Sequence, residues 1–479
     1  MDVLYVASEC APFVKTGGLA DVIGAVPKAL APLGADVKIL LPAYPALLAI
    51  LNTGALVASY DDLFDGPAKL VSVQAEGLDL LLLDAPHLYD RAGSIYLDET
   101  GQDWHDNHLR FGALCRVATD IAREGVADWT PQITHVHDWQ AGLVPLLIEL
   151  DGMAKPPATI VTVHNVAFQG LFQWETKNLF NIPDEHFTSE GAEYWGQLGF
   201  LKAGLAYADA ITTVSPTYAR ELLTPEFGMG LEGVFQARQD DLSGIINGID
   251  LDAWNPKTDP HLAKSYTARS LGRKDDNRAV LAGRFSLTKS DGPLFCVVSR
   301  LTEQKGLDLL LEVLPTLVEN GAQLALLGSG DPDMEAAFRE AQKQHKGQVG
   351  VIIGYDENLS HLMQGGSDAI LVPSRFEPCG LTQLYGLRYG TLPVVATTGG
   401  LADTVTDVSP ETIKAKTATG FHCEPGNAAS LRHAITRTCE AYADRDLWRV
   451  LQRNAMRQPV GWDGSAPTYL ALYKKLLEA

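Results

Sequence analysis

The stretch KTGGLAD at residues 15–21 joins an apolar run at residues 3–7 to a run whose apolar side chains recur at helical spacing. These helical positions are Leu19, Val22, Ile23, Val26 and Leu30. The order predicts a strand, a glycine loop and a helix. Because Gly17 and Gly18 lack a Cβ atom, they can adopt positive φ angles and turn backbone N–H groups toward an anion, and Lys15 adds a positive charge. The stretch therefore indicates an anion-binding loop; an ordinary turn with a solvated lysine is the alternative.

Short apolar runs alternate with longer helical patterns along the whole chain, in two blocks. This alternation is typical of β-α-β units around a parallel sheet that is buried on both faces. The first block predicts strands at residues 3–7, 37–41, 133–136, 159–163, 210–214 and 244–246. The second predicts strands at residues 294–298, 323–327, 348–353, 369–372 and 392–396. We therefore expect an α/β protein with two doubly wound domains that face each other across a cleft.

A weakly apolar stretch with turn residues at 250–291 separates the two blocks and is interpreted as the linker and its surroundings. A Pro-Val-Gly break at 459–461 precedes a last helical pattern. The predicted segments are therefore 1–248 as the first domain, 249–458 as the second, and 459–479 as a helix that crosses back to the first.

The composition limits the classes of function. With 38 basic and 59 acidic residues, the formal net charge is −21, which argues against sequence-independent nucleic-acid binding. No segment approaches the ~20 uninterrupted apolar residues of a membrane span. Lys15 is the first basic residue, so the first apolar run is expected to be a strand and not part of a signal peptide. From these two observations we expect a cytoplasmic location and no membrane partner. The six cysteines form no C-x-x-C pair, so we expect reduced thiols and neither a zinc site nor a disulfide framework.

Ligands of open parallel sheets bind beyond the carboxyl ends of the strands, so the residues after each predicted strand are the candidates for a site. Polar residues and glycines follow most of them. In the first block these are the 15–18 loop, His137-Asp138-Trp139 and His164-Asn165. In the second block they are Arg300 and Lys305, and residues 328–331, 354–356, 373–382 and 397–401.

Arg300 and Lys305 flank four residues before Gly306, which opens the next helical run. Two cations and a helix N-terminus at one place suit a diphosphate. The alternative is that both cations are solvated or pair with a carboxylate such as Glu303. Thr382, at the start of a later helix, could add a hydroxyl and a backbone donor to the same anion.

Glu377 lies in a short loop of limited freedom beside Pro378. A carboxylate in an anion site could face positive charge that develops at an anomeric carbon, or hold sugar hydroxyls. It could equally be an acid at a helix N-terminus. Asp138 and His164-Asn165 offer donors and acceptors for sugar hydroxyls, with an N-cap and a satisfied core histidine as the alternatives.

Other signals are weak. Residues 328–330 begin a G-x-G after a strand, but position 333 is Asp, so the dinucleotide fingerprint fails. His135 and His137 share one side of a strand without further ligands at a metal-binding spacing. No P-loop and no G-x-S-x-G elbow is found. We therefore predict no cofactor and no metal site.

Assembled, these motifs resemble those of the bacterial glycogen synthases and plant starch synthases, retaining glucosyltransferases of the two-lobed GT-B fold. The resemblance runs from end to end. Its most specific elements are residues 15–21, 137–139, 164–165, 299–301 with 304–306, 373–381 and 398–401.

The resemblance implies transfer of α-glucose from ADP-glucose to the non-reducing end of glycogen or another α-1,4-glucan, with retention and without a metal ion. It implies catalytic roles for Glu377, Lys305, Arg300, His164 and Asp138. It implies substrate-binding roles for Lys15, Gly17, Gly18, Asp21, Asn165, Asn247, Tyr355, Cys379, Gly380, Leu381, Thr382 and Tyr96. In this scheme the cations neutralise the leaving diphosphate, Glu377 holds the glucose, and Asn247 belongs to the first lobe. Tyr355 bounds the adenine, and Tyr96 offers aromatic surface to the glucan.

One position departs from the pattern of many retaining GT-B transferases. They carry a second glutamate eight residues after the first, and here that position is Tyr385, which puts the ribose contact in doubt. Three alternatives stay open: a UDP-glucose-using synthase, another GT-B enzyme such as a sucrose synthase or phosphorylase, and a non-catalytic glucan-binding protein. The four residues Lys15, Arg300, Lys305 and Glu377 together argue against the last of these.

Overall fold

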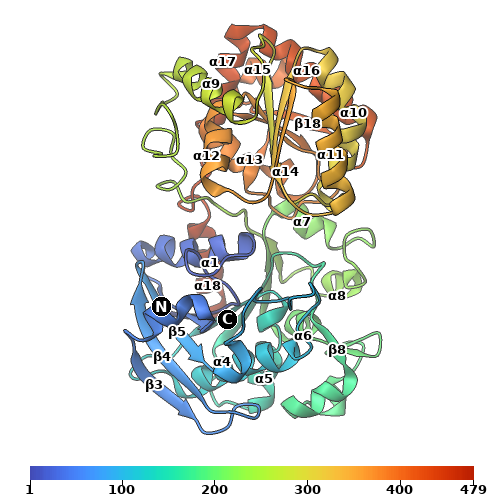
Figure 1. Ribbon diagram of the computed structural model, residues 1–479. Coiled ribbons are helices and arrows are strands. Elements are labelled where there is room, and N and C mark those ends of the chain that lie inside the picture. The colour runs from blue at the N-terminus through green and yellow to red at the C-terminus, as the bar shows by residue number, and fades with distance from the viewer. Residues whose placement is uncertain (479) are drawn as a thin grey trace. The chain divides into compact units, whose positions relative to one another are not determined.

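The computed structural model describes residues 1–478, and the chain divides into two compact units. Unit 1 contains Met1–Ile245 and the C-terminal segment from Trp462, and unit 2 contains Ile246–Gly461. Each unit is built on a largely parallel sheet with helices on both faces (Figure 1). The predicted α/β class is confirmed.

Unit 1 contains a nine-stranded sheet in which β1 marks the point where the strand order reverses. Its strands lie in the order β12 (Leu242–Gly244), β11 (Ala210–Thr213), β7 (Ala158–Val163), β6 (Ile133–His137), β1 (Asp2–Val6), β2 (Asp36–Pro42), β5 (Leu78–Asp84), β4 (Ala68–Ala75) and β3 (Ala55–Tyr60). The chain runs from β1 to β2 on one side, and β6 pairs with the other side of β1, both in parallel register. A crevice for ligands is expected outside the carboxyl ends of β1 and β6.

Three strands of this sheet were not predicted from the sequence. β3 and β4 pair in antiparallel register, as do β4 and β5, so the parallel sheet ends in an antiparallel edge. Only two residues separate β4 from β5, which is too short for a crossover and long enough for a hairpin. The pattern that predicts parallel strands is a strand followed by a helix, and no helix lies between β3, β4 and β5.

The remaining elements of unit 1 are helices and one small sheet. The helices are α1 (Gly18–Leu30), α2 (Leu48–Leu51), α3 (Pro86–Tyr89), α4 (Asn107–Glu124), α5 (Val144–Asp151), α6 (Phe200–Tyr207), α7 (Pro216–Glu221), α8 (Glu232–Ala237) and α18 (Ala466–Glu478). The small antiparallel sheet has the order β8 (Leu171–Gln173), β10 (Gln197–Gly199) and β9 (Glu193–Tyr194).

The C-terminal helix α18 belongs to unit 1 and packs beside α1. Its Tyr469 and Tyr473 are buried, and the Tyr473 hydroxyl lies 2.7 Å from that of Tyr5 in β1. The expected return of the last helix to the first domain is therefore confirmed.

Unit 2 contains a six-stranded sheet in which all pairs are parallel. Its order is β15 (Val349–Ile353), β14 (Gln323–Gly328), β13 (Leu294–Val298), β16 (Ala369–Val372), β17 (Leu392–Ala396) and β18 (Phe421–Cys423). The strand order reverses between β13 and β16. Its helices are α9 (Lys274–Arg284), α10 (Leu307–Glu319), α11 (Pro332–Gln344), α12 (Glu357–Gly366), α13 (Thr382–Tyr389), α14 (Gly399–Thr404), α15 (Pro410–Ala415), α16 (Ala428–Ala443) and α17 (Arg445–Ala455). Helix α9 lies within the segment that was interpreted as a linker.

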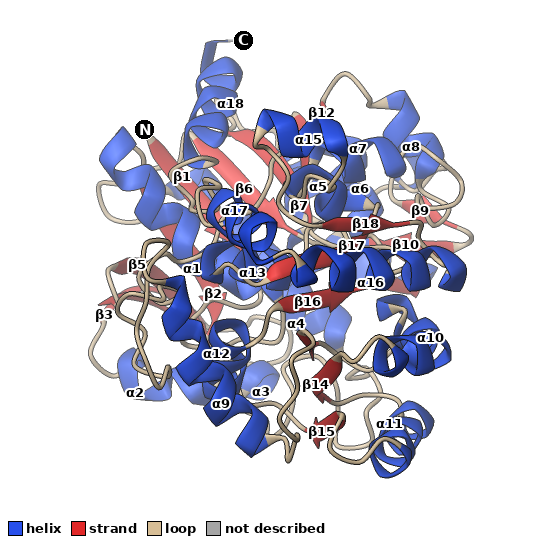
Figure 2. Ribbon diagram, turned by 90° about the horizontal axis from the view of Figure 1, so that it is seen from above, coloured by secondary structure: helices blue, strands red, loops and turns tan. Residues whose placement is uncertain are grey.

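Side chains of β13 alternate between two buried clusters, one on each face of the sheet. Phe295 and Val297 pack with α10 and α16, whereas Leu294 and Cys296 pack with α9 and α12. Figure 2 shows α10 and α11 on one side of β14 and β15, with α9 and α12 on the other. Burial on both faces is the reason why these strands appear in the sequence as continuous apolar runs.

None of the helices formed by residues 1–478 is long and apolar enough to cross a lipid bilayer.

Candidate active site

A pocket in unit 2 lies at the reversal of the strand order, between the loops that follow β13 and β16. It encloses about 200 Å³, less than the roughly 300–1,000 Å³ of a pocket for a whole small ligand. Its lining includes Arg300 and Lys305 from the first loop, Ser374 and Glu377 from the second, and Thr382 at the start of α13. The pocket therefore has room for only part of a large ligand.

Gly306 holds the two loops of this pocket against each other. It has φ +65° at the start of α10, and a Cβ atom there would lie 2.0 Å from the carbonyl oxygen of Pro373. Only glycine accepts both the left-handed backbone and this close approach. The turn places Lys305, directly before Gly306, beside the β16 loop.

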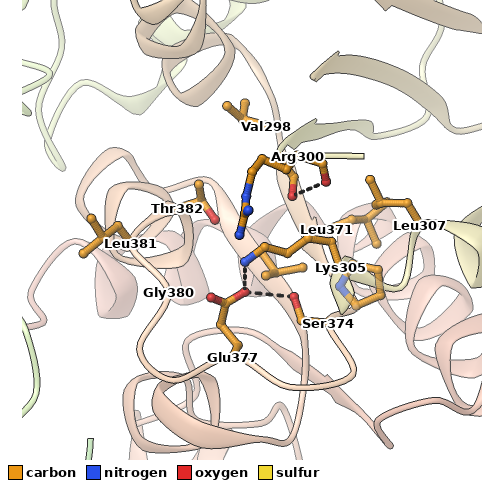
Figure 3. A pocket seen from close by; sticks show the side chains of 13 residues that line it. Val298, Arg300, Lys305, Leu307, Leu371, Ser374, Glu377, Gly380, Leu381 and Thr382 are labelled. Carbon is orange, nitrogen blue, oxygen red and sulfur yellow. Dashed lines mark hydrogen bonds and ion pairs between the residues drawn. The ribbon is translucent and has the colours of Figure 1, made fainter. Parts of the chain in front are cut away.

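The ammonium group of Lys305 forms an ion pair with the carboxylate of Glu377. The Nζ–Oε2 distance is 2.6 Å, and the Ser374 hydroxyl donates to the same oxygen at 2.9 Å (Figure 3). Both charged side chains are more than four-fifths buried. The carboxylate of Glu377 is thus held by two donors. Lys305 pairs with this carboxylate and not with that of Glu303, the possible partner named from the sequence.

Arg300 is exposed, and its guanidinium points toward the ammonium of Lys305 and the carboxylate of Glu377 (Figure 3). Within residues 1–478 this guanidinium has no hydrogen-bonding or ionic partner. A positive charge with five free donors at the mouth of a pocket favours an anionic ligand.

The residues after Glu377 complete the wall of the pocket. Gly380 has φ +71° and leads through Leu381 into α13. Cys379 is buried, which raises the pKa of its thiol to about 12, and the backbone N–H of Asn247 opposes this rise by donating to its sulfur. Asn247 therefore lies in unit 2, whereas the sequence analysis counted it with the first lobe.

Tyr355 and Tyr385, also in unit 2, have different surroundings. Tyr355 is 79% exposed after β15, and its hydroxyl donates to Glu357 at 2.7 Å. Tyr385, at the position of the absent second glutamate, is buried and its ring stacks on Trp254 with a centroid distance of 3.6 Å. Trp254 stacks in turn on His361 at 3.7 Å.

In unit 1 the glycine loop holds an anion supplied by the chain itself, the carboxylate of Glu9. This side chain is buried directly after β1 and accepts from Thr16 N at 2.5 Å, Thr16 Oγ1 at 2.9 Å and Gly17 N at 3.3 Å. The positive φ angles expected of the glycines are wrong: Gly17 is extended at φ −156°, and Gly18 is the first residue of α1. The N–H groups of Thr16 and Gly17 point toward the Glu9 carboxylate although the loop has no left-handed glycine here.

Two further residues of the candidate set are organised by this loop. Lys15 forms an ion pair of 2.8 Å with Asp21 in the first turn of α1. At this position the helix dipole also stabilises the negative charge of Asp21. The Tyr96 hydroxyl donates to Glu9 at 3.2 Å and lies 2.7 Å from Ser8 Oγ. Ser8 and Glu9 were not among the predicted site residues, although they follow the central strand β1 and could have been found by the same rule as the other strand ends.

Asp138 and His164 lie next to each other at the carboxyl ends of β6 and β7. Asp138 has φ +56°, an unusual backbone for a residue with a side chain, and its Oδ1 accepts from the His164 backbone N–H at 2.7 Å. Burial raises the pKa of Asp138 to about 7 and lowers that of His164 to about 3. Asn165 uses its side-chain oxygen to accept from Ala167 N at 3.0 Å.

A buried chain of polar side chains connects His164 with the C-terminal helix. His164 Nε2 lies 3.1 Å from His137 Nδ1, and the His137 ring stacks on His135 at 4.4 Å. His135 Nδ1 lies 2.8 Å from the hydroxyl of Tyr473 in α18. Nothing in the sequence connects Tyr473, more than 300 residues away, with these histidines. Among residues 1–478, no group of three or more His, Cys, Asp or Glu side chains is arranged to hold a metal ion.

Two doubly wound units, each with polar side chains where its strand order reverses, define the GT-B class of glycosyltransferase. Residues 2–237 match the family described as the starch synthase catalytic domain, and residues 282–455 match the glycosyl transferases group 1. The chain therefore belongs to the starch and glycogen synthase family of glycosyltransferases, which confirms the resemblance carried by its motifs.

Full-length relatives agree with this assignment. A glycogen synthase of Roseobacter denitrificans is 61% identical over 100% of both chains, and one of Jannaschia sp. is 53% identical over 98% of both. The solved catalytic domain of starch synthase IV from Arabidopsis thaliana, bound to ADP and acarbose, matches with a TM-score of 0.88 and 31% identity, covering 100% of this chain and 99% of that one.

Proposed function

We propose that this chain is a glycogen synthase that transfers α-glucose from ADP-glucose to the non-reducing end of an α-1,4-glucan, with retention of configuration and without a metal ion. The observation that carries the proposal is the clustering of Arg300, Lys305 and Glu377 at the unit 2 switch point. The names of the relatives and the ADP in the starch synthase structure support the donor and the acceptor. The cytoplasmic location expected from the sequence stays a prediction.

Arg300 and Lys305 would stabilise the negative charge that develops on the diphosphate as the glucosyl bond breaks. Electrostatic stabilisation of such charge is commonly the largest contribution to catalysis. Thr382 and the backbone of Gly380 and Leu381 would add donors at the start of α13. The unpaired guanidinium of Arg300 supports this role, because an anion can bind it without displacing another residue of the described chain.

Glu377 would hold the hydroxyls of the transferred glucose and face the reacting carbon. Ser374 and Lys305 already restrain its carboxylate, so little freedom is lost when substrate binds. Cys379 and Asn247, which contact each other beside it, would shape the sugar pocket, and the exposed ring of Tyr355 would bound the adenine.

The unit 1 residues would bind the sugar and the glucan. We assign Asp138, His164 and Asn165 to the glucose hydroxyls, and Tyr96 to the acceptor. Lys15 would contact the donor, with Asp21 as the carboxylate that positions its ammonium group. Because Gly17 and Gly18 have no side chains, the substrate would be able to approach the backbone of this loop closely.

The test is incorporation of labelled glucose into glycogen from ADP-glucose and, in parallel, from UDP-glucose. We expect incorporation from ADP-glucose and a loss of at least about a hundredfold in Glu377→Gln. Glu319→Gln, which removes an exposed carboxylate at the end of α10, is the matched control and should keep full activity. Equal incorporation by Glu377→Gln would exclude the role assigned to this residue.

Two other outcomes separate the alternative functions. Incorporation from UDP-glucose alone would show that the donor is UDP-glucose and not ADP-glucose. Binding of glycogen without incorporation from either donor would favour a non-catalytic glucan-binding protein.

A further inference from the structure

A tight hairpin of unit 1 presents a tryptophan where the turn geometry disfavours one. Trp195 and Gly196 connect β9 to β10 with φ angles of +51° and +80°, and Tyr194 pairs directly with Gln197. Two-residue turns with both φ angles positive favour Asn-Gly or Gly-Gly, because a larger side chain clashes with its own backbone. The turn therefore does not explain why position 195 is Trp.

The indole of Trp195 is left in solvent at 82% exposure, and a second one lies near it. Trp174, 48% exposed, follows the last residue of β8, and Gln173 pairs with Gln197 in β10. Trp174 begins a 3-10 helix (Trp174–Phe180), so it lies one residue beyond the Gln173–Gln197 pair, at the end of the sheet that carries the Trp195 turn. Two exposed indoles thus share one end of the small sheet, which is labelled β8 in Figure 1 and β9 and β10 in Figure 2.

The turn that carries Trp195 is rigid. The backbone N–H of Gly196 donates to the Glu193 carboxylate at 2.5 Å, and the Tyr194 hydroxyl donates to the Met229 carbonyl at 2.8 Å. The Trp195 ring also meets the Tyr194 ring edge to face at 6.4 Å. A fixed aromatic side chain provides contact area while losing little conformational entropy on binding.

The polar groups at the same end of the small sheet select the chemistry of the ligand. Gln173 and Gln197 are directly opposite each other, so their exposed amide side chains lie on the same face and can donate to and accept from neighbouring hydroxyls. Residues 173–197 contain five acidic residues and one lysine, and that lysine, Lys177, is buried in an ion pair with Asp184. The local charge disfavours an anion, and the amides and flat apolar rings fit a neutral sugar, whose C–H faces stack on indole.

We propose that Trp174 and Trp195 form a secondary platform for α-glucan chains, separate from the residues that hold the reacting sugar. The inference rests on the proposed function only for the kind of sugar polymer. A chain held at a second point raises the effective concentration of the other chains of the same particle, so the platform lowers the KM for a polymer. A short oligosaccharide binds at one point only, so the platform does not lower its KM.

The test uses Trp195→Asn together with Trp174→Ala in the full-length protein. Asn at the first turn position followed by Gly196 is the preferred sequence for this turn, so the variant should fold at least as well. Leu56→Asn is the matched control, because it removes a 59% exposed apolar side chain from β3 of the same unit.

Glycogen in a native gel should retard the wild type and the Leu56 variant, and the double variant much less. In glucose transfer, the double variant should show a KM for glycogen raised about tenfold or more, with kcat and the KM for maltotetraose unchanged. Retardation needs no catalysis, so a platform without glucose transfer would contradict the proposed function alone.

Three results would overturn the platform. One is equal retardation of the wild type and the double variant, or no retardation of either. Another is an equal rise of both KM values, which would place the indoles in the acceptor site itself. The third is a change of oligomeric state on size exclusion without a change in glycogen binding, which would make this surface a protein contact.

Discussion

Replacing Asp138 with Asn removes a carboxylate that the fold of unit 1 holds partly buried. Burial has the largest effect on the pKa of Asp138 and raises it to about 7. The backbone N–H groups of His164 and Asn165 oppose this rise, and the charge of Glu9 adds to it. An Asn side chain keeps an oxygen for the His164 N–H and has no charge to desolvate. The variant should therefore be more stable than the wild type, and by an amount that depends on pH.

The size of the effect follows from proton linkage. Between the usual pKa of 3.8 and the native value of about 7, the folded chain holds a proton that the unfolded chain has released. The free energy of unfolding of the wild type thus falls as the pH rises through this interval, and no penalty exists below it. The full penalty, reached above pH 7, is about 4 kcal/mol, and about 2 kcal/mol of it is present at pH 5. The advantage of Asp138→Asn should therefore grow by about 2–3 kcal/mol from pH 5 to pH 8.

Hydrogen exchange of the β6 and β7 amides, read by mass spectrometry, measures this advantage within unit 1. Variant and wild type are compared at each pH, so that the intrinsic exchange rates cancel. Amides of β13 in unit 2 should not change, and Asp36→Asn, at the exposed start of β2, should show no growing advantage. A difference between Asp138→Asn and wild type that is the same at both pH values would refute the reasoning.

Three other changes have definite expected results. Lys15→Gln should raise the KM for the nucleotide sugar more than the KM for glycogen, because its ammonium is the charge we assign to the donor; a raised glycogen KM alone would contradict this. Tyr473→Phe should lower the free energy of unfolding by about 1–3 kcal/mol in urea titrations, because its hydroxyl has two buried partners; an unchanged midpoint would argue against the contact. Gly306→Ala should lower that free energy by at least about 2 kcal/mol. Gly321→Ala, with φ +73° and open space around it, should lose less, and equal losses would show that the approach to Pro373 contributes nothing.

Most of the parallel strands could be predicted because both of their faces are buried, which leaves continuous apolar runs separated by helical patterns. The three-residue strand β18, which pairs in parallel with β17, was missed. The antiparallel edge formed by β3, β4 and β5 could not be predicted, since its strands follow each other without helices and only their pairing shows where they belong. Helix α9 was missed for a related reason: it is polar on average and is held by packing on α12.

The residues of the unit 2 pocket were identified from their positions after strands, but their pairing was not. Lys305 and Glu377 are 72 positions apart, and Glu303 was the carboxylate named from the sequence as a possible partner of the cations. The contact depends on the adjacency of β13 and β16, which the order of strands along the chain does not reveal.

The glycine loop at residues 15–21 illustrates the same division between sequence and structure. Its residue types determined that N–H groups and a lysine gather where a strand meets a helix, because glycine and the helix start favour this locally. Only the tertiary structure decided which anion the N–H groups hold: the buried carboxylate of Glu9, brought back to Thr16 and Gly17 by the turn after β1. Local backbone chemistry is encoded within a few residues, whereas the partner of a charged group depends on the path that the packed core imposes on the chain, over 7 positions for Glu9 and Thr16 and over 72 for Lys305 and Glu377.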